Sequence, residues 1–219
     1  MSFDIAAACS GFIYGLNIAS QFIKTGQCKY ALIIGAEVLS KILDWTDRNT
    51  CVLFGDGAGA AVLAESQIPG IISIYSGSDG SKGQFLECPA VPVNNLFAAD
   101  DKTKSVVTMN GKEIFRFAVK IIPEGVQKVL ESSRIKLEDI KYIVPHQANI
   151  RIIEASAKKL GINEDKFYLN LDKYGNTSAA SIPLALNEMW EKNLINKGDR
   201  VILVGFGGGL TWGAALIEL

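Results

Sequence analysis

Cys9 is the first residue whose position in the sequence points to chemistry. It ends the small, apolar run "FDIAAAC" (residues 3–9) and stands just before a stretch with the pattern of a helix. Helix N-termini expose unpaired N–H groups and a partial positive charge, so a thiol there ionises more readily and reacts as a nucleophile. The sequence therefore predicts a nucleophilic Cys9. Three other interpretations stay open here: a buried structural thiol, a disulfide partner and a lipid-attachment site.

His146 and Asn176 occupy similar junctions between a strand and a helix. His146, the single histidine, ends an apolar strand in "IVPHQAN", where a neutral imidazole can relay protons or donate to a developing oxyanion. Asn176 lies in "YGNTSAASIP", a pattern that is also common in turns and helix N-caps. The stretch 205–213, "GFGGGLTWG", either offers a backbone N–H to an oxyanion or forms a tight hairpin. Together these residues favour a site built from a thiol, an imidazole and an amide.

Composition and charge exclude several classes of function. The 219 residues are 48% hydrophobic with a formal net charge of −1, whereas a nucleic-acid-binding protein needs a basic surplus. No apolar run reaches the ~18–20 residues that a membrane span requires. Asp4 stands where a signal peptide is basic, and Cys9 comes too early to follow a complete lipoprotein signal. Four cysteines without a C-x-x-C pair, with one histidine, argue against a zinc site. Their number would allow disulfides, but the expected cytosolic compartment argues against them.

The hydrophobic pattern alternates between strand-like and helix-like segments and indicates an α/β fold. We expect a largely parallel, helix-covered sheet whose last strand is antiparallel, with the strand at 29–37 buried. The stretch 81–105 is irregular, and a loop of this length in a compact domain is often functional. Strands are predicted at 2–8, 29–37, 57–66, 70–80, 142–146, 167–170, 200–206 and 211–219, and helices at 12–26, 111–132, 149–160 and 177–193.

The beginning and the end of the chain resemble each other. The first unit consists of a small-residue strand, Cys9, a helix, "YALIIGAE" and "GDGAGAAVLAE". The last unit has the same order: a strand, "GNTSAAS", a helix, "RVILVGF" and "GGGLTWGAALIEL". The chain therefore has the pattern of a duplicated unit whose first copy lacks its beginning. In this alignment Cys9 and Asn176 fall at equivalent helix starts. The predicted division is a partial first half, 1–68, carrying Cys9, and a second half, 69–219, carrying His146 and Asn176.

The sequence strongly resembles β-ketoacyl-acyl carrier protein synthase III, the initiating condensing enzyme of type II fatty acid synthesis, over essentially its whole length. The matching stretches are "DIAAACSGF", "FGDGAGAAVLAES", "VPHQANIRIIEASAKKLG", "YGNTSAASIPLAL" and "FGGGLTWGAALIEL". The resemblance implies a thiolase-like α-β-α-β-α layered sandwich of two pseudo-repeated halves, the first of them incomplete here. It also implies a cytoplasmic homodimer that takes acyl-CoA and malonyl-acyl carrier protein as substrates, with no cofactor and no metal.

The same resemblance implies a catalytic triad of Cys9, His146 and Asn176. Cys9 would take the acyl group from acyl-CoA as a thioester. His146 and Asn176 would hydrogen-bond the malonyl thioester carbonyl and stabilise the enolate that forms as CO2 leaves. The backbone N–H groups of Cys9 and Gly208 would hold the oxyanion of each tetrahedral intermediate. Covalent catalysis and fixed dipoles are the physical means by which such a site works.

Further positions follow from the resemblance. Arg48, in "TDRNT", resembles a residue that contacts the CoA nucleotide. The lining of the pantetheine tunnel is matched by Gly111, Phe115, Ala148 and Asn149. Arg151, Lys158 and Lys159 look like the basic patch that docks the acidic carrier protein, and their spacing places them on one helical face. A solvated helix side without a partner is the alternative for these three residues.

Two alternatives from other classes remain open. Family members run to roughly 300 residues, in keeping with two halves of ordinary domain size. This chain begins just before the nucleophile, so we expect it to be poorly active alone, and a fragment that dimerises or binds carrier protein without catalysis is one alternative. A papain-like cysteine hydrolase is the other, because the order Cys, His, Asn matches, but its C-G-[SA]-C-[WY] sequence does not occur.

Other condensing enzymes of the superfamily fit less well than synthase III. Elongating condensing enzymes use two histidines, and this chain has one. Thiolases use a second cysteine near the C-terminal glycines, and "GFGGG" contains none. The residue counts therefore favour the initiating type within this superfamily.

Overall fold

A computed structural model describes residues 1–68, 70–89 and 105–219 of the chain. The strands are β1 (Tyr30–Glu37), β2 (Gly57–Ala64), β3 (Ile71–Ser78), β4 (Leu86–Glu87), β5 (Thr108–Met109), β6 (Tyr142–Pro145), β7 (Arg200–Gly207) and β8 (Thr211–Glu218). The α-helices are α1 (Gly11–Lys24), α2 (Gly111–Ser133), α3 (Ile150–Leu160), α4 (Leu171–Tyr174) and α5 (Ser181–Glu191). Two short 3₁₀ helices matter for the site: η1 (Ala8–Ser10) leads into α1, and η6 (Ser178–Ala180) leads into α5.

The strands form one four-stranded sheet, in the order β3-β8-β7-β6, and two separate pairs, β1 with β2 and β4 with β5. In these sheets β6 and β7 run parallel and every other pair is antiparallel. The predicted antiparallel last strand is confirmed, and the predicted largely parallel sheet is wrong. Residues 208–210 alone join β7 to β8, and so short a connection can link only antiparallel strands.

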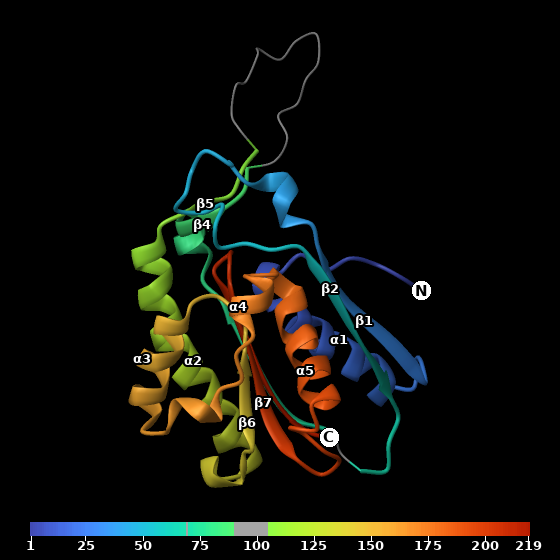
Figure 1. Cartoon of the computed structure of the whole chain (residues 1–219). Coiled ribbons are helices and arrows are strands. Elements are labelled where there is room, and N and C mark those ends of the chain that lie inside the picture. Colours follow the sequence, from blue (N-terminus) through green and yellow to red (C-terminus); the bar gives the residue numbers. More distant parts are fainter. Residues whose placement is uncertain (69, 90–104) are drawn as a thin grey trace.

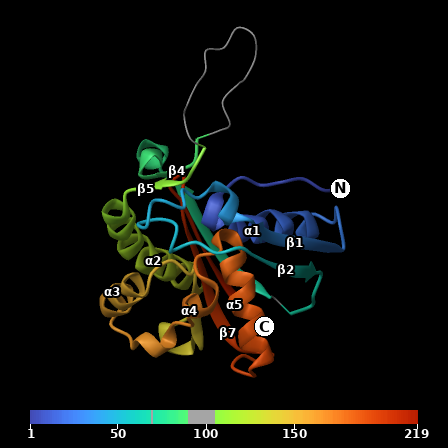
Figure 2. The same ribbon diagram turned by 45° about the horizontal axis from the view of Figure 1, so that its top comes forward.

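Helices cover both faces of the four-stranded sheet (Figure 1). α2, with α3 beside it, packs on one face and contacts β3, β7 and β8. α1 and α5 lie on the other face and also contact the β1–β2 pair, so they form a central layer between the two sheets (Figures 1 and 2). The layers run helices, sheet, helices, sheet, which gives four of the five layers of the expected sandwich.

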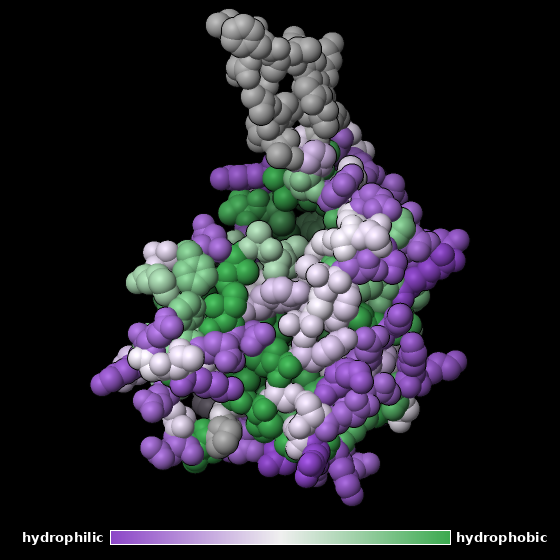
Figure 3. All heavy atoms as spheres, turned by 180° about the vertical axis from the view of Figure 1, so that it is seen from behind, coloured by the Kyte–Doolittle hydropathy of each residue, from purple (hydrophilic) through white to green (hydrophobic). Residues whose placement is uncertain are grey.

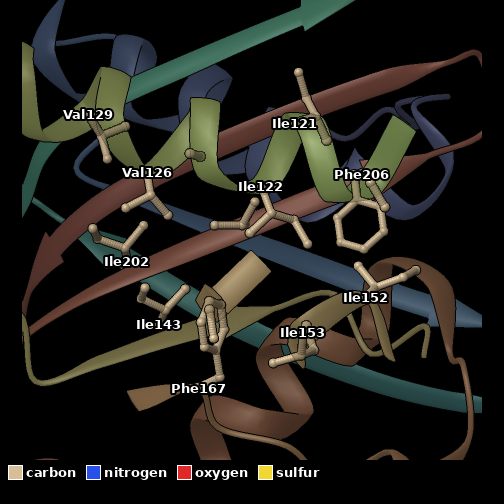
Figure 4. Close-up of a cluster of buried hydrophobic side chains, with 14 of the residues drawn as sticks. Ile121, Ile122, Val126, Val129, Ile143, Ile152, Ile153, Phe167, Ile202 and Phe206 are labelled. Carbon is tan, nitrogen blue, oxygen red and sulfur yellow. The ribbon is translucent and has the colours of Figure 1, made fainter. Parts of the chain in front are cut away.

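α2 is anchored by an apolar face that the sequence repeats every three or four residues. Asn110 caps its first turn, since its side chain accepts from the N–H of Glu113 at 3.3 Å. Figure 4 shows its buried side chains turned toward those of β6, β7 and α3. Burying each large aliphatic side chain contributes about 1.5–3 kcal/mol. The labelled members of this core are Ile121, Ile122, Val126, Val129, Ile143, Ile152, Ile153, Phe167, Ile202 and Phe206.

A second core fills the space between the two sheets and fixes the helices that follow η1 and η6. α1 contributes Phe12 and Ile13, which are 2% and 0% exposed, and α5 contributes Ile182 and Met189, at 1% and 0%. These residues meet Leu203 of β7 in one cluster. The starts of α1 and α5 are therefore held rigidly, each against a sheet.

The predicted helices agree with the structure better than the predicted strands. The segments 12–26, 111–132 and 149–160 correspond to α1, α2 and α3, and 177–193 corresponds to η6 with α5. The predicted strand 2–8 is wrong, because residues 1–6 are exposed and pair with no described strand. The predicted strand 167–170 is reduced to one bridge, Phe167 with Ile143. Of the predicted loop 81–105, residues 90–104 lie outside the described residues.

β1 is buried on one face only, which corrects the expectation of a fully buried strand. Its inward residue Ile33 is 8% exposed, whereas Tyr30, Leu32 and Ile34 are 71%, 62% and 61% exposed. Val62, which neighbours Leu32 on β2, is also largely exposed. The molecule seen from behind likewise shows hydrophobic residues at its surface, flanked on both sides by hydrophilic ones (Figure 3).

Candidate active site

Cys9 lies in η1, between the four-stranded sheet and the start of α1. Its backbone enters this turn through Ala8, whose φ of 44° is rare for a residue with a side chain. Gly205 and Gly207 of β7 allow the close approach: a Cβ on Gly207 would lie 2.8 Å from the Cβ of Cys9 and 2.9 Å from its Sγ. The bare backbone at Gly207 therefore provides the space that the thiol occupies.

The Cys9 thiol is buried, and this changes its expected chemistry. Burial raises its pKa to about 11, and the nearby Glu37 carboxylate acts in the same direction. Hydrogen bonds from the Ser178 side chain and from the backbone N–H groups of Cys9 and Gly208 lower it without reversing the shift. The expectation of a readily ionised thiol is therefore wrong for the resting protein, because desolvation outweighs the helix start. The two predicted oxyanion donors are thus among the groups that lower the pKa of the thiol, and their oxyanion role stays a prediction.

His146 follows β6 and is held by the adjacent strand. Its backbone N–H donates to the carbonyl of Val204 at 2.7 Å, and its ring packs edge-on against Phe206 with 5.3 Å between centroids. The side chain is 2% exposed, and Nδ1 has no hydrogen-bond partner within the described part of the chain. Burial lowers the pKa of His146 to about 4, against an opposing effect of the Ser178 backbone. The imidazole is therefore neutral at neutral pH.

Gln147 holds the loop that carries His146. Its Nε2 donates to the carbonyls of Pro145 and Tyr168 at 2.9 and 3.2 Å, and its Oε1 accepts from the N–H of Asn170 at 3.0 Å. The Asn170 side chain in turn donates to Glu188 at 2.8 Å. Burial alone would raise the pKa of Glu188, but hydrogen bonds from two lysines and Asn170 bring it to about 2. A buried polar network therefore fixes the residue next to the imidazole.

Asn176 is fixed on three sides by backbone groups. Its N–H donates to the carbonyl of Leu53 at 2.8 Å, and its carbonyl accepts from the N–H of Gly55 at 2.9 Å. The side-chain Oδ1 accepts from the N–H of Ser178 at 2.9 Å. Because the oxygen is engaged in this bond, the amide has its Nδ2 group left to donate.

Ser178 is the residue on which the three predicted side chains converge. Its N–H donates to Oδ1 of Asn176 at 2.9 Å. Its side chain lies near enough to the Cys9 thiol to lower the pKa of that thiol, and its backbone lies near enough to His146 to raise the pKa of the imidazole. Like Ala8 it has a positive φ, 49°. Sequence reasoning missed Ser178, because nothing in "GNTSAAS" distinguishes it from an ordinary cap residue.

The structure also corrects the expected equivalence of Cys9 with Asn176. Each of the two 3₁₀ turns begins with a positive-φ residue, Ala8 in η1 and Ser178 in η6. If these residues are aligned, Cys9 corresponds to Ala179, and Asn176 precedes its turn. The duplicated turn is real, but its two copies place their functional side chains at different positions.

Neither a metal cluster nor a membrane span is found in the described ranges 1–68, 70–89 and 105–219. No three His, Cys, Asp or Glu side chains gather there in a way that could hold a metal ion. No helix of this part is both long and apolar enough to cross a bilayer. A surface hollow of about 480 Å³ is bordered by residues 138–141 and 198–200.

Comparisons with known proteins decide the family. Models described as 3-oxoacyl-[acyl-carrier-protein (ACP)] synthase III and its C-terminal part match residues 3–80 and 130–219. The Beta-ketoacyl-[acyl-carrier-protein] synthase III of Clostridium kluyveri is 60% identical over 217 residues, which cover 99% of this chain and 67% of the relative. The chain belongs to the β-ketoacyl-acyl carrier protein synthase III family.

Solved structures of synthase III confirm the fold. The synthase III of Aquifex aeolicus is 45% identical and superimposes with a TM-score of 0.90, covering 99% of this chain and 67% of that one. The synthase III of Thermus thermophilus is 43% identical with a TM-score of 0.92, at the same coverage. The thiolase-like layered architecture expected from the resemblance is therefore confirmed for this member of the synthase III family.

The positions expected to bind CoA in a synthase III lie on several elements here. Arg48 is exposed in a turn between β1 and β2, and Gly111 is exposed at the start of α2. Phe115 and Ala148 are partly buried against the α2 core. Asn149 caps α3, its side chain accepting from the N–H of residue 151 at 2.9 Å. These geometries leave the binding roles as predictions.

The positions expected to dock the carrier protein lie together on α3. Arg151, Lys158 and Lys159 are all exposed on this helix. The predicted placement of three cations on one helix is therefore confirmed, whereas the docking role stays a prediction.

Proposed function

We propose that this chain carries out the initiating condensation of type II fatty acid synthesis. Acyl-CoA and malonyl-acyl carrier protein would give β-ketoacyl-acyl carrier protein, CoA and CO2 through an acyl-Cys9 intermediate. The observation that carries the proposal is the convergence of a buried thiol, a neutral imidazole and an oriented amide on Ser178. Membership of a family of acyltransferases that condense acyl groups supports it.

In the first step Cys9 attacks the carbonyl carbon of the acyl thioester. The S–C bond to Cys9 forms, the bond to CoA breaks, and the proton of the thiol ends on the released CoA. The N–H groups of Cys9 and Gly208 would hold the oxyanion that develops next to the sulfur, and their effect on the pKa of the thiol supports this role. Because the resting thiol is neutral, we expect deprotonation to accompany substrate binding.

In the second step the malonyl thioester loses CO2. The resulting negative charge spreads onto the thioester carbonyl, where a hydrogen bond from His146 and one from Nδ2 of Asn176 would stabilise the enolate. The carbanion then attacks the acyl-Cys9 carbonyl, and the Cys9 thiolate leaves. A neutral imidazole suits this role, since burial lowers the pKa of His146 to about 4. No step needs a cofactor or a metal.

The proposed partners follow from the resemblance to synthase III. Arg48 would contact the CoA nucleotide, and the pantetheine arm would pass Gly111, Phe115, Ala148 and Asn149. Arg151, Lys158 and Lys159 form an exposed cationic surface on α3 that suits an acidic carrier protein. We further propose a cytoplasmic homodimer. Within each chain, residues 1–68 would form a partial first thiolase-like half and residues 69–219 the second.

The test is intact-protein mass spectrometry after incubation with acetyl-CoA. We expect one acetyl adduct that forms slowly on the wild-type chain, since the chain alone is expected to be poorly active, and loss of this adduct in Cys9→Ala. Cys88→Ala is the matched control, because this exposed cysteine lies outside the site. An adduct that persists in Cys9→Ala would contradict the proposal. Peptide hydrolysis without decarboxylation would instead indicate a cysteine hydrolase.

A further inference from the structure

Glu37 is a carboxylate at the candidate site that the proposed mechanism does not use. It is the last residue of β1, and its Oε1 accepts from the backbone N–H of Ala179 at 3.2 Å. The Ser178 side chain also lies near enough to lower the pKa of this carboxyl group. Ala179 is 142 positions away in the sequence, so this contact ties the first sheet directly to the turn that carries Ser178.

The two strand pairs show that Glu37 has a counterpart. Gly35 pairs with Gly59 in β1–β2, and Gly205 pairs with Gly213 in β7–β8, so the two hairpins align on their glycines. Two residues beyond Gly35 is Glu37, and two residues beyond Gly205 is Gly207.

Each aligned glycine packs on one of the two 3₁₀ turns. A Cβ on Gly35 would lie 2.7 Å from the carbonyl oxygen of Ala179 in η6. A Cβ on Gly205 would lie 3.0 Å from the Cα of Ser10 in η1. Each hairpin therefore supports one turn, and the residue two positions further on faces that turn. At Gly207 this residue leaves space for a thiol, whereas at Glu37 it supplies an acceptor.

We propose that Glu37 is a positioning residue of this site: its carboxylate holds η6 through the Ala179 N–H, so that Ser178 keeps the Asn176 amide and the Cys9 thiol in place. This inference rests on the roles proposed above for Cys9 and Asn176. A turn entered through a positive φ is strained for a residue with a side chain and persists where its surroundings fix it. The carboxylate–N–H bond provides such a restraint, and charged acceptors make the stronger hydrogen bonds.

The charge of Glu37 has a second consequence for the thiol. After burial, Glu37 is the next cause that raises the pKa of Cys9. Burial also raises the pKa of Glu37 itself, while the Ala179 N–H and the Ser178 side chain lower it. Cys9 from η1 and His146 after β6 are the titratable groups that share Ser178 with this carboxylate. Glu37 thus opposes early ionisation of the nucleophile while fixing the groups around it.

The experiment compares Glu37→Gln with Glu37→Ala in the full chain. Glutamine keeps an oxygen that accepts from Ala179 but removes the charge, whereas alanine removes both. Glu218→Gln is the matched control, because this strand glutamate pairs with Arg200 away from the site. The first readout is the iodoacetamide alkylation rate of Cys9 at several pH values, followed by peptide mass spectrometry. Cys88 in the same sample gives an internal reference for an exposed thiol.

We expect both Glu37 variants to alkylate Cys9 at lower pH than the wild type, with Cys88 unchanged. The second readout is steady-state condensation. We expect kcat to fall about 10–100-fold in Glu37→Ala with little change in KM, and to be rescued to within about 3-fold in Glu37→Gln. A merely structural role would not give this rescue together with a shifted pH profile.

Three results would overturn the inference. One is an unchanged Cys9 alkylation profile in Glu37→Gln. Another is a kcat in Glu37→Ala within about 2-fold of the wild type. The third is equal impairment of the two variants, which would assign the effect to packing and not to the hydrogen bond. If the wild type itself forms no acetyl adduct, the proposed function fails, while the alkylation profile still decides whether Glu37 acts on Cys9.

Discussion

The turn before α1 and the turn before α5 have the same backbone shape and carry different side chains. Both begin with a residue of positive φ, Ala8 or Ser178, and both pack on a glycine of an antiparallel hairpin. One turn presents the Cys9 thiol, whereas the other presents the backbone and hydroxyl of Ser178. The comparison teaches that a repeated backbone provides two similar turns, and that single side chains then give each turn a different role in the site.

The difference is clearest two residues beyond each hairpin glycine. Gly207 has no side chain, so the thiol of Cys9 fits against it. Glu37 has a long side chain, and its carboxylate accepts from the backbone N–H of Ala179 in η6. At this repeated position the glycine therefore leaves room for the Cys9 thiol, whereas the glutamate holds the turn that carries Ser178.

The largest effect should come from changing the η6 side at Asn176. Asn176→Asp keeps the oxygen that accepts from Ser178 but removes the donor, so we expect condensation to fall by about 10²–10³-fold. Acylation of Cys9 should fall much less, because the η1 turn is unchanged. Both steps are measured in one preparation, by malonyl decarboxylation and by the acyl adduct. Asn187→Asp, at an exposed site on α5, is the control, and a parallel loss of both steps would contradict the division of labour.

A smaller effect should follow from adding a side chain at Gly207, the position in β7 that corresponds to Glu37 in β1. In Gly207→Ala the new Cβ would stand 2.8–2.9 Å from the side chain of Cys9, so the thiol must move. We expect acyl-Cys9 formation to slow by about 100-fold, the cost of a misplacement near 1 Å. Gly80→Ala is the control, since a Cβ there meets nothing within 4 Å. Acylation of Gly207→Ala at the wild-type rate would show that the close approach is irrelevant.

The smallest effect concerns His146, which follows β6 and lies near Ser178 of η6, and it appears as pH-dependent stability. Its pKa is lowered from 6.5 to about 4 in the folded chain, so between these values the unfolded chain binds the extra proton. Stability is then lost as the pH falls through this window, by about 1 kcal/mol at pH 5.5. Urea unfolding at pH 7.5 and 5.5 measures it. The decrease in unfolding free energy between these pH values should be about 1 kcal/mol smaller in His146→Asn than in the wild type. An identical decrease in both proteins would contradict the lowered pKa of His146.

Local pattern predicted the helices well and the strands less well. α2 begins after Asn110, which caps its first turn, and it continues along a repeating apolar face that needs no distant partner to be recognised. A strand exists only where another backbone pairs with it. Residues 2–8 carry a strand-like pattern but find no partner in the described chain, and 167–170 finds one bridge only. The direction of pairing was misjudged for the same reason, since it depends on which strands become neighbours.

The sequence predicted which residue types make up the candidate site, but it did not predict the contacts that hold them together. Cys9, His146, Asn176 and the N–H of Gly208 could be named from motifs at strand-to-helix junctions and from the resemblance that they carry. Ser178 and Glu37 could not, because their importance arises from contacts between segments far apart in the chain. A serine two residues after an asparagine has no distinctive sequence signal.

The sequence by itself determined the α/β class, the repeated pattern of glycines in its first and last units, and the presence of a thiol, an imidazole and an amide close to predicted helix starts. Only the tertiary structure decided that the thiol is neutral, that Ala179 and not Asn176 is the counterpart of Cys9, and that Ser178 joins the three groups. The physical reason is that a pKa depends on desolvation and on nearby charges. Those surroundings come from β1, β7 and η6, which meet Cys9 only after the chain has folded.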